Sequence, residues 1–282
     1  MRIFVTGSDG FTGRHFISRA RAAGNEVVTL QASLADRLGI TEELFKARAD
    51  AVVHLAAIAF VGHSEASAFY DVNVLGTTNL LDALVTMEHR PKVVLLASSA
   101  NIYGNSDASP ISEIHSPAPV NHYAMSKLAM EYMARNYMDR LPIVIARPFN
   151  YTGVGQSESF VIPKLVSHFT RKVPEIELGN LDIEREFNDV RTVCEAYLGL
   201  LDKGVPGECY NICSGNPVKL RKAIILLEEM TNHNLKVRVN PVFVRVSEVH
   251  RLCGSPAKLE AAIGLLQHHN LRETLNWMLD ES

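Results

Sequence analysis

The sequence predicts an α/β protein that combines a doubly wound parallel sheet with a smaller mixed α/β lobe. A glycine-rich turn follows an apolar strand near the start of the chain, at residues 7–13. Apolar runs without polar alternation recur at residues 51–57, 92–97 and 142–146, and such runs are typical of parallel strands covered on both faces. Helical patterns separate these runs, and the alternation of strand with helix predicts a parallel sheet.

The length and composition of the chain limit its class. With 282 residues it can bury a substantial core, as one large domain or as two lobes. A hydrophobic content of 47% and a charged content of 21% are ordinary for a globular protein, and the net charge of −3 gives no general reason to expect nucleic-acid binding. No apolar run has the length of a membrane span, and a strand that starts at residue 2 leaves no room for a signal peptide. We therefore expect a cytoplasmic protein.

The cysteines and histidines follow no metal-binding pattern. The four cysteines form no C-x-x-C pair, and we interpret them as free thiols of a cytoplasmic protein. The eleven histidines contain no H-E-x-x-H motif, so we expect no metal site.

The glycine-rich turn has the position of a dinucleotide-binding turn. Its spacing is G-x-x-G-x-x-G, with Gly7, Gly10 and Gly13 between the first strand and a helical pattern that ends at residue 24. Glycines let such a turn close and let a pyrophosphate approach the backbone, while the helix N-terminus offers free N–H groups and a positive dipole end. We predict a Rossmann domain with this turn, Phe11 and Arg14 in its cofactor site.

The second predicted strand, residues 26–30, ends on Gln31 rather than on an acidic residue. In NAD-binding units an acidic residue near this point accepts hydrogen bonds from the adenosine ribose. Gln31 would not repel a 2′-phosphate, and Arg14 or Arg37 is a candidate partner for it, so the sequence favours NADP(H) over NAD(H). Asp36 is either an adenine contact or a solvated loop residue.

Further candidates follow the next two strands, at the sheet edge where open α/β proteins bind ligands. The strand at residues 51–57 ends in side chains that leave space for a flat ligand, namely Leu55, Ala56 and Ala57. A helical pattern at residues 71–85 carries Asn73, and the strand at residues 92–97 delivers Ser98 and Ser99. We expect these positions to face the cofactor cleft.

Tyr123 and Lys127 begin a helical pattern that reaches about residue 138. Residues four apart share a helix face, so the phenol and the ammonium can point into one cleft. A free tyrosine has a pKa of about 10, and a nearby cation lowers that pKa toward the working range of an acid/base group. We therefore predict that Tyr123 and Lys127 act together with Ser99.

At this point the chain resembles the extended short-chain dehydrogenase/reductase family of nucleotide-sugar enzymes over nearly its whole length. The matching motifs are T-G-S-D-G-F-T-G at 6–13, H-L-A-A at 54–57, N-V-L-G-T at 73–77, S-S-A-N-I-Y-G at 98–104, Y-A-M-S-K at 123–127 and A-R-P-F-N at 146–150. The resemblance implies that Ser99 is the catalytic hydroxyl, that Tyr123 is the acid/base, and that Lys127 holds the nicotinamide ribose. It also implies that Arg147 supports the cofactor end and that Asn150 lies beside the substrate.

The position after the catalytic serine narrows the reaction. Family members that eliminate water carry an acidic residue there, whereas this chain has Ala100 and Asn101. Without a base of suitable pKa, the proton beside the ketone has no acceptor. We therefore expect a reductase or an epimerase rather than a dehydratase.

Two segments of the second half resemble the family branch of GDP-mannose dehydratases and GDP-4-keto-6-deoxymannose reductases. They are residues 179–187, G-N-L-D-I-E-R-E-F, and residues 245–249, R-V-S-E-V, in which a valine replaces the usual proline. Arginine grips diphosphates bidentately, and a carboxylate can accept hydrogen bonds from both hydroxyls of a ribose. We predict Arg185 and Arg245 on the diphosphate of a GDP-sugar and Glu248 on its ribose. Further substrate candidates are Ser99, Asn101, Asn150, Phe160, Val161, Lys164 and Asn180.

These observations predict the organisation of the chain. Residues 1–158 form the dinucleotide-binding domain, and residues 159–282 form a smaller nucleotide-sugar-binding lobe. A segment at about residues 188–215 returns to the first domain. We expect a homodimer, with the helices around residues 71–85 and 123–138 at the interface, because the second helix is apolar over more than one buried stripe.

The predicted activity is the reduction of the C4 ketone of GDP-4-keto-6-deoxymannose, giving a GDP-rhamnose or a GDP-6-deoxytalose. An NAD-dependent nucleotide-sugar epimerase and a 4-ketoreductase of a UDP- or dTDP-sugar are alternatives. A cofactor-sensing binding protein without activity is a further alternative, against which the intact Ser99, Tyr123 and Lys127 argue.

Overall fold

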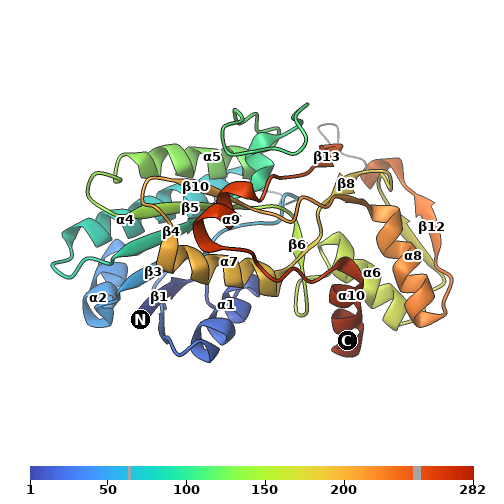
Figure 1. Ribbon diagram of the computed structural model, residues 1–282, viewed down its shortest axis with the longest axis horizontal. Helices are drawn as coiled ribbons and strands as arrows, with labels where there is room; N and C mark the ends of the chain where they lie inside the picture. Colours follow the sequence, from blue (N-terminus) through green and yellow to red (C-terminus); the bar gives the residue numbers. More distant parts are fainter. Residues whose placement is uncertain (63–64, 244–248) are drawn as a thin grey trace.

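The centre of the molecule is a parallel sheet of six strands in the order β10-β5-β4-β3-β1-β2. The computed structural model describes residues 1–62, 65–243 and 249–282, and Figure 1 shows its arrangement. The strands are β1 (Arg2–Thr6), β2 (Glu26–Thr29), β3 (Ala51–His54), β4 (Val93–Ala97), β5 (Ile143–Pro148) and β10 (Cys209–Ile212). Because the order runs outward from β1 in both directions, the sheet is doubly wound, and the predicted Rossmann-type fold class is confirmed.

Helices cover both faces of this sheet (Figure 1). One face packs against α1 (Phe11–Ala22), α7 (Val190–Lys203) and α9 (Ala257–Ile263). The other packs against α2 (Arg37–Ala47), α4 (Thr77–Thr86) and α5 (His122–Arg135). Successive residues of a strand point to opposite faces, so Ile3 and Val5 belong to the first layer and Phe4 to the second. This two-sided burial explains why consecutive residues in the middle of the central strands are apolar.

The helical pattern at residues 71–85 is interrupted in the structure. It consists of a π-helical turn (Asp71–Gly76) and α4, and the short helix α3 (Ala66–Tyr70) precedes it. In the wide turn, the amide of Asn73 exchanges hydrogen bonds with the backbone of Ile58, and the Thr77 hydroxyl bonds to the Asn73 carbonyl. The sequence analysis predicted one helix over residues 71–85 and did not predict this π-helical turn.

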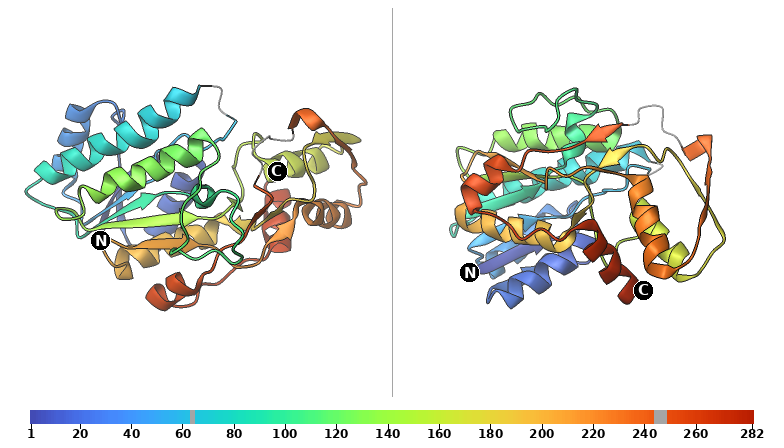
Figure 2. Two further views of the ribbon diagram at one scale, coloured as in Figure 1. Left: turned by 90° about the horizontal axis from the view of Figure 1, so that it is seen from above. Right: turned by 45° about the vertical axis from the view of Figure 1, so that its right-hand side comes forward.

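The smaller lobe has a core of its own (Figure 2). Its helices are α6 (Val161–Thr170), α8 (Leu220–Thr231) and α10 (Leu271–Asp280), which pack on the two-stranded pair β7 (Glu175–Leu178) and β12 (Lys236–Val239). Short strands join this lobe to the sheet, namely β6 (Tyr151–Thr152), β8 (Glu184–Arg185), β9 (Asn188–Asp189), β11 (Val218–Lys219) and β13 (Arg251–Leu252). Two 3₁₀ helices complete the elements, Ala100–Tyr103 and Pro241–Phe243.

Between α6 and α8 the chain returns to the large sheet through α7 and β10, which pairs with β5.

Across the described ranges no helix is long and apolar enough to cross a membrane. The four cysteines are free thiols.

Candidate active site

The glycine-rich turn between β1 and α1 closes against the loop that follows β3. Gly7 has a φ of +72°, and a Cβ there would lie 2.5 Å from the backbone nitrogen of Ala56. A Cβ on Gly13 would lie 2.1 Å from the Gly7 carbonyl oxygen. Gly10 is the N-cap of α1 and brings no capping side chain, so the first N–H groups of the helix are left for a ligand. The turn therefore fits the pyrophosphate of a dinucleotide.

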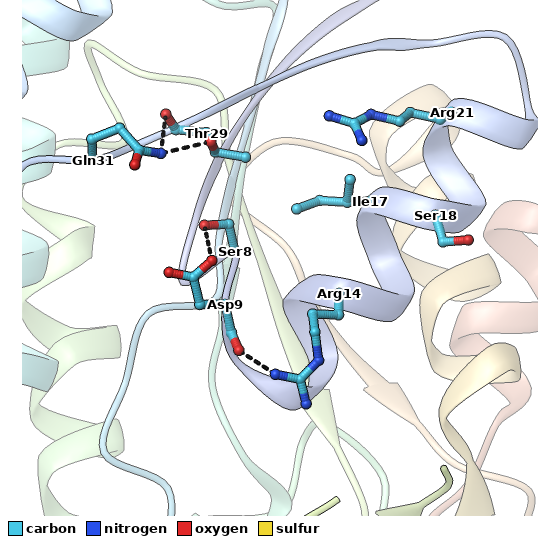
Figure 3. Close-up of a pocket in the computed structure, with 8 residues that line it drawn as sticks. All are labelled: Ser8, Asp9, Arg14, Ile17, Ser18, Arg21, Thr29 and Gln31. Carbon is cyan, nitrogen blue, oxygen red and sulfur yellow. Dashed lines mark hydrogen bonds between the residues drawn. The ribbon is translucent and has the colours of Figure 1, made fainter. Parts of the chain in front are cut away.

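A cavity of about 480 Å³ opens beside this turn, between α1 and the end of β2 (Figure 3). Its walls are polar on the turn and strand sides and consist of Ser8, Asp9, Arg14, Ile17, Ser18, Arg21, Thr29 and Gln31. The Gln31 amide donates to the Thr29 hydroxyl at 2.9 Å. Arg14 and Gln31, two of the residues predicted to bind the cofactor, both line this cavity.

Two other residues proposed for the adenosine end have different partners. Arg37 lies 3.2 Å from the Asp82 carboxylate and does not line the cavity. Asp36 is the N-cap of α2, and its carboxylate accepts a hydrogen bond from the Gly39 N–H at 3.0 Å. The spacing Asp36–Gly39 is that of an N-cap and its N3 residue, and this signal was present in the sequence.

A carboxylate from α2 does reach the end of β2, and the sequence analysis missed it. Both oxygens of Glu43 accept hydrogen bonds at 2.8 Å, one from the N–H of Gln31 and one from that of Ala32. Glu43 was missed because it is twelve residues beyond Gln31, on a helix that folds back over the strand end. Its carboxylate is held by backbone donors and is not among the residues that line the cavity.

The loop after β3 is held from beneath by buried polar groups. His54 lies between the hydroxyls of Thr6, at 2.7 Å, and Thr77, at 2.9 Å, and the Thr6 hydroxyl accepts from the Ala56 N–H. Burial lowers the pKa of His54 to about 3, with a smaller contribution from the charge of Lys127, so the ring is neutral at physiological pH. Asn73 is 1% exposed and bonds to the backbone of Ile58. Asn73 therefore positions the loop that carries Leu55, Ala56 and Ala57.

Ser99 and Tyr123 meet at the carboxyl end of β4. Ser99 is the N-cap of the 3₁₀ helix that follows β4, and Tyr123 is in the first turn of α5, whose N-cap is Asn121. The Ser99 hydroxyl lies near the Tyr123 phenol and lowers its pKa. The two hydroxyls thus form one donor pair that can face an oxygen atom of a ligand.

The electrostatics of this pair differ from the prediction. Burial raises the pKa of the Tyr123 phenol above 10, and the hydrogen bond with Ser99 only partly offsets that rise. The predicted lowering by Lys127 is absent, because the Lys127 ammonium donates to the Ala97 carbonyl at 2.7 Å. Burial also lowers the pKa of Lys127 to about 8, against an opposing effect of Glu131. Tyr123 is therefore protonated at neutral pH and is suited to donate a proton.

Arg147 lies below the site rather than along a ligand surface. Its guanidinium binds both oxygens of Glu131, at 2.9 and 2.6 Å, and donates to the Tyr103 hydroxyl at 2.8 Å. Glu131 is 1% exposed and also accepts from the hydroxyl of Ser98, the neighbour of Ser99. All three guanidinium nitrogens of Arg147 have protein partners, so its support of the cofactor end is indirect. The sequence analysis missed Glu131, although it follows Lys127 by one helical turn.

The residues after Ser99 carry no base. Ala100 is buried, and the amide of Asn101 donates to the Ser99 hydroxyl at 3.1 Å. Asn101 therefore holds the Ser99 hydroxyl in place, and neither Ala100 nor Asn101 carries a carboxylate.

Four residues of the predicted substrate set have contacts that the structure describes or are exposed. Asn150 is exposed at the end of β5, and the ring of Phe160 meets that of Phe60 edge-on at 5.8 Å. Val161 packs on the core of the small lobe, and the Lys164 ammonium donates to the Glu177 carbonyl at 3.2 Å.

The remaining predicted substrate residues lie around β8. The Asn180 side chain accepts from the Asp182 N–H at 2.9 Å, and Arg185 donates to the carbonyls of Glu184 and Val249. Arg245 and Glu248 lie outside the described residues. Of the three residues proposed to bind the GDP diphosphate and its ribose, the structure therefore describes Arg185 alone.

Glu186, next to Arg185, is a buried carboxylate that the sequence analysis did not identify. It accepts hydrogen bonds from the N–H groups of Ser214, at 2.6 Å, and Gly254, at 2.6 Å, and is fully buried. A single carboxylate therefore joins the substrate-lobe strand β8 to the loop after β10 and to the segment after β13. These donors are backbone N–H groups far from Glu186 in the sequence, so the residue types at their positions could not predict the contact.

The turn at Gly7, the donor pair of Ser99 and Tyr123, and the helical placement of Lys127 define an NAD(P)-dependent oxidoreductase of the short-chain dehydrogenase/reductase type. Sequence comparison gives a finer assignment. The pattern of the GDP-mannose 4,6 dehydratase family matches residues 18–278, and the chain belongs to that family.

Two curated relatives are similar over nearly the whole chain. GDP-6-deoxy-D-talose 4-dehydrogenase of Aggregatibacter actinomycetemcomitans is 37% identical, over 94% of this chain and 92% of that protein. GDP-6-deoxy-D-mannose reductase of Pseudomonas aeruginosa is 34% identical, over 99% and 96%.

Two solved structures agree closely with this fold. A Burkholderia cenocepacia J2315 protein, provisionally named an epimerase, is 47% identical with a TM-score of 0.93, covering 99% of this chain and 97% of that one. RMD from Pseudomonas aeruginosa, solved with NADPH, is 34% identical with a TM-score of 0.92, covering 99% and 98%.

Proposed function

We propose that this protein reduces the C4 ketone of GDP-4-keto-6-deoxymannose to the alcohol of a GDP-6-deoxyhexose. The observation that carries the proposal is the Ser99–Tyr123 donor pair with a protonated phenol and without a carboxylate at Ala100 or Asn101. This arrangement can donate a proton to a ketone oxygen but provides no base at that position for dehydration. The names of both curated relatives refer to GDP-6-deoxyhexoses, which supports the same substrate class.

The chain's own groups then perform the acid half of the reduction. When bound, the reduced nicotinamide cofactor supplies a hydride to C4. The Ser99 hydroxyl holds the ketone oxygen, and Tyr123 transfers its phenolic proton to that oxygen as negative charge develops, so the carbonyl gains one hydride and one proton. Ser99, which lowers the pKa of the Tyr123 phenol, stabilises the phenolate that remains. Preorganised donors of this kind act where charge develops in the transition state.

NADPH is the reductant that we propose. Gln31 is neutral at the end of β2, and Arg14 and Arg21 line the neighbouring cavity, so a 2′-phosphate would meet positive charge. The similarity to a structure that contains NADPH supports this choice.

The substrate diphosphate is assigned to the small lobe. We propose that Arg185 and Arg245 bind it and that Glu248 binds the ribose, with Asn150 and Phe160 closer to the sugar. The opposite side of the gap is taken by the cofactor turn, so the charge of the diphosphate must be balanced from this lobe.

The active form that we propose is a cytoplasmic homodimer. Large apolar side chains are exposed on the π-turn and on α5, namely Leu75 (57%), Met125 (43%) and Tyr132 (52%). Burial of this face against a second copy would remove it from water. Light scattering tests the dimer, since a monomer has a mass of 31.2 kDa. Tyr132→Glu should shift the wild-type mass to that of the monomer, and a wild type that is already monomeric at micromolar concentration would contradict the dimer.

The experiment that tests the activity is a stoichiometric assay. GDP-4-keto-6-deoxymannose is incubated with NADPH or NADH, and the consumed cofactor is compared with the sugar that is formed. A reductase consumes one reduced cofactor per product, whereas an epimerase on a tightly held NAD consumes none. Absence of turnover with GDP-, UDP- and dTDP-linked 4-keto sugars would instead indicate a binding protein without activity.

A further inference from the structure

The cavity beside α1 contains two cations that differ in their partners. Arg14 and Arg21 line it together with Thr29, Gln31 and a single carboxylate, Asp9. The Arg14 guanidinium donates to the Asp9 carbonyl at 2.6 Å and to the Gly155 carbonyl at 3.1 Å. The Arg21 guanidinium forms no hydrogen bond or ion pair with any residue in the described part of the chain. Arg14 therefore braces the glycine-rich turn, and Arg21 is available to a ligand.

The helix explains how a residue from the far end of α1 reaches this cavity. Arg14, Ser18 and Arg21 are spaced by four and three residues and so share one helix face. Helical side chains lean toward the N-terminus of their helix, which directs Arg21 back toward the glycine-rich turn. In Figure 3 its guanidinium extends across the cavity toward Thr29, at the end of β2. This is the side of the turn on which the adenosine ribose of a dinucleotide lies in such folds.

We infer that Arg21 selects the phosphorylated cofactor by binding the 2′-phosphate of its adenosine ribose. This inference rests on the proposed use of NADPH and names the side chain responsible. Other candidates are engaged elsewhere: Arg37 pairs with Asp82, and Glu43 is held by the backbone of Gln31 and Ala32. Asp9 is the one carboxylate on the cavity wall, and its oxygen accepts from the Ser8 hydroxyl. Two guanidinium groups against one carboxylate leave the wall net positive for an anion.

Binding of two nucleotides that differ only in the 2′-phosphate tests this assignment. Calorimetry on the full-length enzyme compares adenosine 2′,5′-bisphosphate with 5′-AMP. Arg21→Ala should weaken the bisphosphate about tenfold or more, since a charge-assisted hydrogen bond is lost, and should change 5′-AMP binding less than twofold. Arg21→Lys should recover part of the loss. Arg19→Ala is the matched control, because Arg19 is on the same helix, pairs with Glu195 at 2.8 Å and does not line the cavity.

The outcomes separate this inference from the proposed function. If Arg21→Ala weakens both nucleotides equally, or weakens neither while the wild type still prefers the bisphosphate, Arg21 is not the selecting residue. If the wild type binds both nucleotides equally, the cavity does not recognise a 2′-phosphate and the inference is overturned. Turnover of the 4-keto sugar with either reduced cofactor is measured separately, so the reductase activity stands or falls on its own result.

Discussion

Glu131 and Arg147 form a buried bidentate ion pair, with nitrogen–oxygen distances of 2.9 and 2.6 Å, one helical turn after Lys127. The pair ties α5 to β5, and through Ser98 it also ties α5 to the end of β4. Helix α5 carries Tyr123 and Lys127, and Ser99 follows β4. The relative positions of the catalytic groups therefore depend on a contact that touches no ligand.

Removing one partner of this pair should destabilise the protein strongly. Glu131→Gln leaves the Arg147 cation buried without its counter-charge, and breaking a buried pair in this way costs about 3–5 kcal/mol of unfolding free energy. Urea denaturation measures the loss. Glu42→Gln is the control, since Glu42 forms an exposed pair with Lys46 at 3.9 Å and should change stability by less than about 1 kcal/mol. If the two variants had equal free energies of unfolding, the buried pair would not contribute to the stability of the fold.

Tyr123→Phe should remove the proton donor and leave the fold and cofactor binding nearly intact. General acid catalysis contributes about 10²–10⁴-fold, so kcat should fall by that factor. Steady-state kinetics with the 4-keto sugar measure the change, and Tyr132→Phe, on the same helix and 52% exposed, is the control. A Tyr123→Phe enzyme within threefold of wild type would remove Tyr123 from the mechanism.

His54 should make the fold sensitive to acid. Its pKa is about 3 in the folded protein against 6.5 ordinarily, so between these values the unfolded chain binds more protons than the folded one. The stability that the neutral ring provides is thus present above pH 6.5 and is lost as the pH falls, by up to about 1.4 kcal/mol per pH unit.

Unfolding curves of wild type and His54→Gln at several pH values measure this effect. The two free energies of unfolding should converge as the pH falls from 6.5 toward 4. His268→Gln, at an exposed position, should follow the wild type throughout. A constant gap between wild type and His54→Gln would contradict the assignment.

Arg245→Ala should raise KM for the GDP-sugar about ten- to a hundredfold, because one charge-assisted bidentate contact to the diphosphate is lost. The change in kcat should be smaller, because the diphosphate is remote from C4 and is bound similarly before and during hydride transfer. Arg238→Ala, which removes an exposed arginine paired with Glu175, is the control. Weaker NADPH binding with an unchanged sugar KM would mean that the lobes were assigned to the wrong ligands.

Local patterns were sufficient to predict the fold and to single out Ser99, Tyr123 and Lys127 as candidates. The runs of consecutive apolar residues, the glycine spacing and the four-residue step from Tyr123 to Lys127 are all visible within short windows. They correspond to β1, β3, β4 and β5, the turn at Gly7 and the first turns of α5.

The supporting groups could not be predicted in the same way. Glu43, Glu131 and Glu186 act on partners supplied by other elements, mostly through backbone N–H groups that leave no trace in the sequence. The pKa of Tyr123 was mispredicted for a related reason. Its direction depends on burial and on the Ala97 carbonyl that holds Lys127, and both are tertiary features.

The most direct test of the account is to follow the transferred hydrogen. GDP-4-keto-6-deoxymannose is reduced with NADPH that carries deuterium at the transferable nicotinamide position, and the product is identified by NMR. We expect one NADPH consumed per sugar, deuterium at C4 of a GDP-6-deoxyhexose, and a coupling pattern that distinguishes the rhamno from the talo configuration. Product that forms without consumption of NADPH, or that carries protium at C4, would contradict a 4-keto reduction.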